Sequence, residues 1–356
     1  MKKSYFRKDI DAMSGYVPGA QPKIANIIKL NTNENAYAPS PKVFEILKNF
    51  DAASLRKYPD PVSLELRKVI AKLHENGFSE NNVIVGNGSD DILTMIFRSF
   101  SSNELPFSCV NPTYSLYHEL AEIQGAKCIK VALNKENSFA FPQVDQLLEE
   151  IKDANFFILP RPNAPTGNSF SLDKMRKICK NFDGIVVFDE AYADFAEDNC
   201  IELVNEFDNC IVTRTLSKSY SLAGIRLGYA IANETIIQGM NKVRDSYNID
   251  AVTQAVAIAA LKDQEYFTKN VEKIKASRAR LAEELTKIGF KVLPSQTNFL
   301  FVMPPDQDGE RYFNLLMENA IVTRYFKGDM TKEFVRISIG SETEIEQLLA
   351  VTKKYF

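Results

Sequence analysis

One segment of the sequence, residues 215–226, gathers groups that could hold an anion beside a reactive amine. Thr215 and Ser217 carry hydroxyls, Lys218 carries an amine, and Arg226 follows within the same segment. Hydroxyl and guanidinium donors bind phosphate well, and a lysine placed among them can act as a nucleophile. A lone lysine in a loop is usually solvated, so the chemistry depends on what accompanies Lys218.

A carboxylate, Asp189, directly follows the apolar run 185–188, which is too hydrophobic to lie at a surface. An unpaired carboxylate buried there would be strongly penalised, so Asp189 needs a cationic partner. A tyrosine, Tyr192, follows shortly after it. The sequence therefore predicts a buried acid that faces a positively charged group.

A third group of residues, 86–91, combines two glycines with Ser89, Asp90 and Asp91. The glycines allow a tight turn, and Ser89 and Asp90 can cap the helix that follows, whose free N–H groups favour a phosphate. A dinucleotide fingerprint would need glycine where Asp91 stands, and a Walker loop is absent from the sequence. The segment is consistent with a phosphate site of another kind.

Short apolar runs alternate with amphipathic stretches between about residues 83 and 232. Such runs are typical of strands buried on both faces of a mostly parallel sheet, with helices as crossovers. The predicted strands are 83–85, 107–110, 156–159, 185–188, 211–213 and 227–231, and the predicted crossover helices include 91–100 and 172–182. Ligands of such α/β sheets sit beyond the carboxyl ends of the strands, where Asp189 is placed.

The pattern changes after about residue 245. A long helical pattern over 253–288 is ended by Gly289 and is followed by strand-like runs at 299–302 and 335–339, which indicates a smaller α+β domain. The first 45 residues are too short to fold alone and are expected to pack on that domain. The predicted organisation is an N-terminal arm at 1–45, a large domain at 46–245 and a small domain at 246–356.

Composition and charge restrict the class of protein. The chain has 356 residues and a formal net charge of -3 without a block of basic residues, so no nucleic-acid partner is expected. Five cysteines without CxxC spacing indicate reduced thiols and a cytoplasmic location, and no apolar stretch is long enough to cross a membrane. His74 and His118 are far apart, so an all-histidine metal site cannot be built; both are expected to be surface or structural residues, and no metal is predicted.

Taken together, the residues resemble a known family. Residues 215–226 resemble the Schiff-base segment of fold-type-I pyridoxal-phosphate enzymes, and Asp189-Glu190-Ala191-Tyr192 resembles their ring-nitrogen motif. The subgroup that the chain resembles most is the histidinol-phosphate aminotransferases. The resemblance covers nearly the whole chain through seven further ordered motifs, which are Tyr16-Val17-Pro18-Gly19, Leu30-Asn31-Thr32-Asn33-Glu34-Asn35, Tyr58-Pro59-Asp60-Pro61, Gly86-Asn87-Gly88-Ser89-Asp90, Asn111-Pro112-Thr113-Tyr114, Asn163-Ala164-Pro165-Thr166-Gly167 and Val335-Arg336-Ile337-Ser338-Ile339-Gly340.

The resemblance implies pyridoxal 5'-phosphate as cofactor, a fold-type-I architecture, and a homodimer with its active site at the domain and subunit boundary. Lys218 would carry the cofactor as a Schiff base and move a proton, Asp189 would pair with its ring nitrogen, and Tyr192 would reach its 3' oxygen. A ring kept cationic is an electron sink for negative charge at the substrate carbon. The residues further implied to hold the cofactor are Gly88, Ser89, Asp90, Tyr114, Thr215, Ser217 and Arg226, together with Tyr58, which would reach the cofactor of the neighbouring subunit.

The implied reaction is amino transfer between glutamate and a small phosphorylated amine or its carbonyl partner. Arg336 resembles the arginine that clamps the substrate carboxylate, a task that suits a bidentate guanidinium. Arg324, Tyr16 and Asn33 lie in segments that this subgroup uses near the substrate. A catalytically silent protein on the same fold is disfavoured, because both the lysine and the ring-nitrogen acid are present.

The sequence departs from the family pattern at Ala164, where many of these enzymes have asparagine before Pro-Thr-Gly. Asn163 is expected to replace the missing bond to the cofactor's 3' oxygen, or Tyr192 to act alone. Arg161 is interpreted as a surface residue at a strand end, with a contact to the substrate phosphate as the alternative. Threonine-phosphate decarboxylases are similar across the same motifs, so decarboxylation of a phosphorylated amino acid is the alternative reaction.

Overall fold

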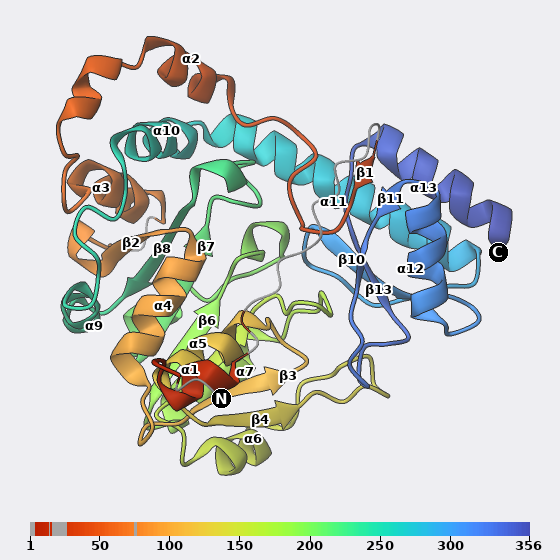
Figure 1. Ribbon diagram of the computed structural model, residues 1–356, viewed down its shortest axis with the longest axis horizontal. Helices are drawn as coiled ribbons and strands as arrows, with labels where there is room; N and C mark the ends of the chain where they lie inside the picture. Colours follow the sequence, from red (N-terminus) through yellow and green to blue (C-terminus); the bar gives the residue numbers. More distant parts are fainter. Residues whose placement is uncertain (1–3, 14, 16–26, 75–76) are drawn as a thin grey trace.

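A seven-stranded, mostly parallel sheet forms the centre of the larger part of the molecule (Figure 1). The computed structural model describes residues 4–13, 15, 27–74 and 77–356. The strand order is β2-β8-β7-β6-β5-β3-β4, in which β8 is antiparallel to both neighbours and the other pairs are parallel. The strands are β2 (Val83–Asn87), β3 (Phe107–Asn111), β4 (Cys128–Ala132), β5 (Phe156–Pro160), β6 (Ile185–Asp189), β7 (Cys210–Thr215) and β8 (Leu227–Ala232).

The six apolar runs predicted as strands are all strands of this sheet, and both predicted crossover helices are present as α4 and α7. The apolar pattern does not predict β4. This strand lies at the edge of the sheet, and of its five residues only Val131 is buried, so it lacks the continuous apolar run that marks the inner strands.

The inner strands bury side chains on both faces of the sheet. On β5, Phe156 and Ile158 join one apolar core with residues of α4 and α5, whereas Phe157 and Leu159 join a second core with residues of α6 and α7. The helices of this part are α2 (Pro41–Asn49), α3 (Leu64–Leu73), α4 (Ser89–Phe100), α5 (Leu116–Gln124), α6 (Val144–Ile151), α7 (Leu172–Asn181), α8 (Leu203–Glu206), α9 (Glu234–Asn241) and α10 (Ala251–Leu261), with the short α1 (Lys8–Ala12) against α5.

A second, four-stranded antiparallel sheet lies beside the first (Figure 1). Its order is β12-β13-β10-β9, and it packs with three helices, α11 (Gln264–Lys287), α12 (Gly309–Glu318) and α13 (Glu342–Tyr355). Its strands are β9 (Lys291–Val292), β10 (Phe299–Met303), β12 (Arg324–Tyr325) and β13 (Val335–Ser338). Near it, β1 (Ile28–Lys29) pairs in parallel with β11 (Ile321–Val322), which joins the N-terminal segment to this part of the chain. The domain boundaries at residues 45 and 245 stay a prediction.

The helical pattern over 253–288 forms two helices, and the prediction of one continuous helix is wrong. The chain leaves the helical conformation at Asp263, whose φ and ψ are -103° and 62°. The Asp263 carboxylate accepts hydrogen bonds from Ser40 and Lys42 at the start of α2. Apolar periodicity continues across this break, so the sequence pattern does not mark a turn that is fixed by a distant segment.

Among the described residues, no helix combines the length and the apolar character needed to cross a membrane. All five cysteines are free thiols. His74 has the structural role expected of it, since its Nε2 lies 3.0 Å from the Tyr229 hydroxyl. The cytoplasmic location expected from the cysteines stays a prediction.

Candidate active site

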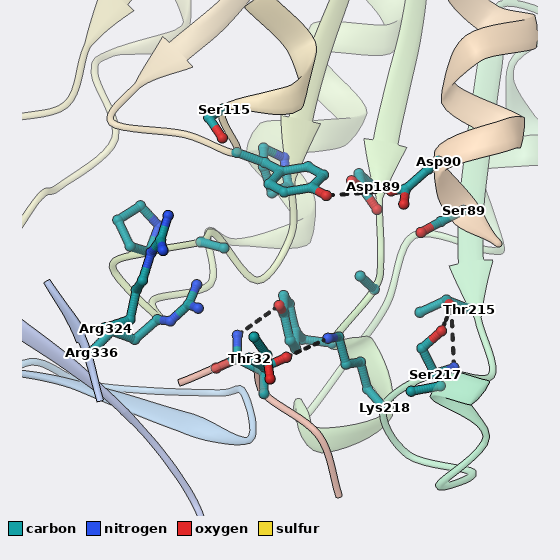
Figure 2. Close-up of a pocket in the computed structure, with 18 of the residues that line it drawn as sticks. Thr32, Ser89, Asp90, Ser115, Asp189, Thr215, Ser217, Lys218, Arg324 and Arg336 are labelled. Carbon is teal, nitrogen blue, oxygen red and sulfur yellow. Dashed lines mark hydrogen bonds between the residues drawn. The ribbon is translucent and has the colours of Figure 1, made fainter. Parts of the chain in front are cut away.

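A cavity of about 420 Å³ lies where the large sheet faces the small one. Its wall includes the last residues of β5, β6 and β7, which are Pro160, Asp189 and Thr215, and two arginines of the small sheet, Arg324 and Arg336. Open parallel sheets bind ligands beyond the carboxyl ends of their strands, so the cavity has the expected position. Figure 2 shows its polar side chains converging from both parts of the chain.

Most of the site residues predicted from sequence line this one cavity. They are Asn33, Ser89, Asp90, Tyr114, Asp189, Tyr192, Thr215, Ser217, Lys218, Arg226, Arg324 and Arg336. Gly88 precedes the lining residue Ser89, Asn163 and Tyr58 are not part of the wall, and Tyr16 lies outside the described residues.

Asp189 is a buried carboxylate that is held by hydrogen bonds. Its Oδ2 accepts a hydrogen bond of 2.6 Å from the Tyr117 hydroxyl, and its Oδ1 accepts one of 3.1 Å from Thr213. Burial raises the pKa of the Asp189 carboxyl, and these two hydrogen bonds oppose the rise. The next residue, Glu190, is also buried but is paired with Arg214 at 2.7 Å. Within the part of the chain that the structure describes, no salt bridge reaches Asp189, so its carboxyl can pair with a cationic group of a ligand.

Tyr117 is a site residue that the sequence analysis missed. It lies on α5, is fully buried, and packs edge-on against Tyr114 with ring centroids 5.7 Å apart. Burial and the neighbouring Asp189 raise the pKa of the Tyr117 hydroxyl well above its usual range, so it stays a donor. Tyr114 lies just before α5 and Tyr117 is the second residue of that helix, so no motif in the sequence marks Tyr117 as a partner of Asp189.

The start of α4 can hold an anion. Ser89 is the first residue of this helix, and the Gly88 before it has a φ of 82°. The hydroxyls of Thr215 and Ser217 are 3.0 Å apart, and Arg226 Nη1 lies 3.3 Å from Ser217 Oγ. Figure 2 shows Ser89, Thr215 and Ser217 on the same side of the cavity. Hydroxyl and guanidinium donors at a helix N-terminus favour a phosphate.

Two glycines allow the close packing of this anion site. A Cβ at Gly228 on β8 would lie 2.4 Å from the Ser89 nitrogen, and a Cβ at Gly88 would lie 2.3 Å from Arg226 Nη2. The Asp90 carboxylate is partly neutralised by Arg226 Nη2 at 3.2 Å and accepts a hydrogen bond of 3.3 Å from Tyr114. The absence of side chains at Gly88 and Gly228 therefore lets the start of α4 lie directly against Arg226 and β8.

The amine of Lys218 is oriented by the N-terminal segment. Its Nζ donates to the Thr32 carbonyl at 3.0 Å and lies 5.9 Å from the centre of the Tyr192 ring. The Tyr192 hydroxyl accepts a hydrogen bond of 2.9 Å from Asn33 Nδ2, and the Asn33 backbone N–H donates to Ser338 Oγ on β13. Figure 2 shows the hydrogen bond between Lys218 and Thr32. The small sheet, the N-terminal segment and the lysine are thus physically linked.

A second anion site is built from two arginines on neighbouring strands. Arg324 on β12 and Arg336 on β13 are direct register partners. Arg336 donates to the Asn31 carbonyl at 2.8 Å, and both guanidinium groups lie over the Phe326 ring at 5.4 Å. Like charges placed opposite each other on a sheet repel, and a bound carboxylate or phosphate relieves the repulsion. Figure 2 shows this pair on the opposite side of the cavity from Ser89 and Thr215.

The cavity wall at the position of the missing asparagine is formed by Ala164. Asn163 is fully buried behind it, where its Nδ2 donates to the Pro112 carbonyl at 3.2 Å and to Thr166 Oγ1 at 2.7 Å. Of the two groups expected to compensate for Ala164, Tyr192 therefore faces the cavity and Asn163 does not.

The interpretation of Arg161 as a surface residue is wrong. Its side chain is 1% exposed, its Nε donates to the Phe170 carbonyl at 2.7 Å, and its Nη2 pairs with Asp198 at 2.6 Å. Arg161 does not line the cavity either, so a contact with the substrate has no support. All residues of β5 are buried, and the Arg161 side chain that follows them is buried too, where it pairs with the Asp198 carboxylate.

The family described as "Aminotransferase class I and II" matches residues 25–351 of the chain. The chain belongs to this family. It is an enzyme, an aminotransferase, and the predicted family and the predicted α/β fold-type-I architecture are confirmed.

Relatives of the aminotransferase match over nearly its full length. The histidinol-phosphate aminotransferase of Geobacter sp. (strain M21) is 44% identical over 349 residues, which are 98% of this chain and 97% of the relative. The crystal structure of histidinol-phosphate aminotransferase from Sinorhizobium meliloti in complex with pyridoxal-5'-phosphate has a TM-score of 0.89 and 26% identity, covering 100% of this chain and 99% of that one. The L-threonine-O-3-phosphate decarboxylase from Porphyromonas gingivalis matches with a TM-score of 0.79, covering 92% of this chain and 99% of that chain; at 19% identity this likeness shows the fold alone.

Removal of the Tyr117 hydroxyl is expected to damage catalysis more than stability. In Tyr117→Phe the Asp189 carboxylate loses a charge-assisted hydrogen bond worth about 1.5 to 3 kcal/mol, so kcat/KM should fall on the order of 10- to 100-fold. Because a donated hydrogen bond lowers the pKa of a carboxyl, the acidic limb of the activity profile should also move to higher pH.

The matched control is Tyr312→Phe, another fully buried tyrosine, whose hydroxyl contacts Thr352 at 2.9 Å outside the cavity wall. Steady-state kinetics across pH and thermal unfolding should be measured on both variants. If both keep the wild-type pH profile and kcat/KM, Tyr117 has no part in the site.

Proposed function

We propose that this aminotransferase uses pyridoxal 5'-phosphate to move an amino group between glutamate and a small phosphorylated amine or its carbonyl partner, with histidinol phosphate as the first candidate. The observation that carries the proposal is the pair of anion sites in one cavity, at the start of α4 and at Arg324 and Arg336, with Lys218 and Asp189 in the same wall. The first anion site suits the cofactor phosphate, and the second suits the anionic group of a substrate.

The chemistry of the wall fits the cofactor. Asp189 is a buried carboxylate that no salt bridge of the described residues reaches, which suits a protonated ring nitrogen. The donors around Ser89, Thr215 and Arg226 suit a phosphate monoester. The Tyr114 ring, also in the wall, suits the face of a pyridine ring. When bound, the cofactor supplies an electron sink for negative charge at the substrate carbon.

The residues of the chain divide the remaining work. Lys218 would hold the cofactor covalently and, once released, would move a proton between the substrate carbon and the C4' carbon of the cofactor. Its hydrogen bond to the Thr32 carbonyl orients Nζ toward the cavity. Asp189, fixed by Tyr117 and Thr213, would hold the proton on the ring nitrogen.

The two arginines would recognise the substrate. A guanidinium binds a carboxylate or a phosphate through two parallel hydrogen bonds, so Arg324 and Arg336 can serve glutamate in one half of the cycle and the phosphorylated partner in the other. The relatives named histidinol-phosphate aminotransferase, such as that of Geobacter sp. (strain M21) at 44% identity, support histidinol phosphate as that partner.

A homodimer is part of the proposal. Tyr58 is 80% exposed, stacks on Tyr247 with ring centroids 4.6 Å apart, and is not part of its own chain's cavity wall. Apolar side chains near Tyr58 in the sequence are also exposed, namely Phe44 and Leu47 on α2, Leu55 and Val62. An exposed apolar surface of this kind supports an interface between subunits, across which Tyr58 would reach the cofactor phosphate of the neighbour.

A substrate panel tests the reaction. The purified holoenzyme should form 2-oxoglutarate from glutamate and the ketone that corresponds to histidinol phosphate, and should release no carbon dioxide from phosphorylated amino acids supplied alone. The variant Lys218→Ala should lose the transfer and the covalent link to the cofactor while its circular dichroism stays that of the wild type. Carbon dioxide release without 2-oxoglutarate would instead assign the enzyme to the phosphorylated amino acid decarboxylases.

The substitution Arg336→Lys tests the substrate site. It keeps the charge but loses the guanidinium fork, so kcat/KM for glutamate should fall on the order of 10- to 100-fold, which corresponds to about 1.5 to 3 kcal/mol, with the cofactor spectrum unchanged. A purely structural arginine would behave differently: thermal stability would fall and kcat/KM would stay within about twofold. Lys332→Arg, an exposed basic position near β13, serves as a control for handling and charge.

The substitution Tyr58→Phe tests the subunit arrangement. The protein should be a dimer in sedimentation at working concentration, and loss of the hydroxyl should raise the dissociation constant of the cofactor by roughly 10-fold, in line with one lost phosphate hydrogen bond of about 1.5 kcal/mol. A fully active monomer would rule out this arrangement.

A further inference from the structure

Three potential metal ligands converge at the edge of the large sheet. Cys109 lies on β3, Cys128 on the edge strand β4, and His118 on α5. One ligand atom from each lies within 4.8 Å of the other two, and none of the three residues is part of the cavity wall of the candidate active site. The cluster therefore needs an explanation of its own.

The spacing of the two sulfur atoms suits a metal centre. Cys109 Sγ and Cys128 Sγ are 3.7 Å apart. In a tetrahedral zinc site with Zn–S bonds of about 2.3 Å, two sulfur ligands lie about 3.8 Å from each other. A disulfide would bring them to about 2.05 Å. Two thiols in simple contact can also reach this separation, so the deciding feature is the imidazole of His118, which offers a ring nitrogen within 4.8 Å of both sulfur atoms.

The elements that carry the ligands hold them in place. β3 and β4 are paired in parallel over five residues, and α5 begins directly after the loop that follows β3. Cys109 is fully buried, whereas Cys128 and His118 are partly exposed, so an ion can enter from the surface. Three protein ligands leave a fourth position for water.

The charge and softness of the donors select the ion. Two thiolates and a neutral imidazole balance a divalent cation, and soft sulfur ligands favour zinc over magnesium or calcium. Because thiolates are the metal-binding form of cysteine, metal binding would release the thiol protons of Cys109 and Cys128.

We propose that Cys109, His118 and Cys128 form a binding site for a zinc-type divalent cation, separate from the active site. The ion would tie α5 to the two outermost strands of the sheet. Tyr117, next to His118 on this helix, donates to Asp189, so the ion would also steady the helix that positions the buried acid. The expectation of no metal site considered histidines alone, and strand pairing brings together cysteines that are distant in sequence.

Metal retention by the holoenzyme tests the proposal. Protein stripped with a chelator and then given Zn²⁺ should retain about one ion per chain after gel filtration, as measured by elemental analysis, and its thermal midpoint should rise. The variants His118→Gln and Cys128→Ser should each weaken Zn²⁺ binding by more than about 100-fold, since loss of a mere second-shell partner costs about 10- to 100-fold.

The matched control is Cys179→Ser. Cys179 on α7 shares a hydrogen bond with Cys210 on β7. Among the described residues, this pair of thiols is not part of any group that could hold a metal ion. The variant should therefore retain Zn²⁺ like the wild type. Co²⁺ added to the wild type should give the red-region bands of a tetrahedral thiolate site, a result that needs no variant to fold.

Three results would overturn the proposal. They are no retained Zn²⁺ in the wild type, equal retention in His118→Gln, and a Cys109–Cys128 disulfide found by mass spectrometry in protein alkylated without reductant. Amino-transfer activity is measured separately on the same samples, so failure of the metal site and failure of the proposed reaction can be told apart.

Discussion

The burial of one carboxylate, Asp189, is the constraint around which the candidate active site is arranged. Asp189 stands at the end of β6, in the middle of the sheet, where an ionised acid is costly. The fold supplies it with hydrogen bonds from Tyr117 and Thr213, and none of the described residues forms a salt bridge with it. Glu190, one residue later, has its own arginine and can therefore be purely structural. Of these two adjacent acids, Glu190 is paired within the protein, whereas Asp189 can still pair with a ligand.

The other walls of the cavity come from both parts of the chain. The start of α4 and the loop that carries Thr215 and Ser217 form one side, and the small sheet forms the other. Lys218 reaches the space between them, and the N-terminal segment fixes its amine through Thr32. Since Asn33 in the same segment is bonded to Ser338 of the small sheet, a shift of that sheet would be transmitted to the lysine environment.

The sequence predicts most of this arrangement because the inner strands are continuous apolar runs and the chemical groups directly follow them. It does not predict β4, whose residues are largely exposed, or the break at Asp263, which depends on Ser40 and Lys42 far along the chain. The sequence does not predict the role of Tyr117, because the orientation of α5 rather than a motif directs its hydroxyl toward Asp189.

Motif matching also has a limit at the level of single side chains. Asn163 stands beside the expected position, yet its amide is taken up by Pro112 and Thr166, and the small Ala164 faces the cavity. Arg161 was judged by its place at a strand end, whereas its burial depends on an acidic partner, Asp198, from a later segment. Such outcomes follow from tertiary packing, which one sequence does not display.

The distance between the two anion sites would restrict the length of the substrate. Under the proposed function, the start of α4 would hold the phosphate of the cofactor and so fix the place of the reacting carbon, while the arginine pair lies at the other side of the cavity (Figure 2). The distance between the amino-bearing carbon of a substrate and its distal anion would then have to match the distance between these two points. A molecule with the right charge but too short a span would leave Arg324 and Arg336 repelling each other across β12 and β13, so the cavity would select for length as well as for charge.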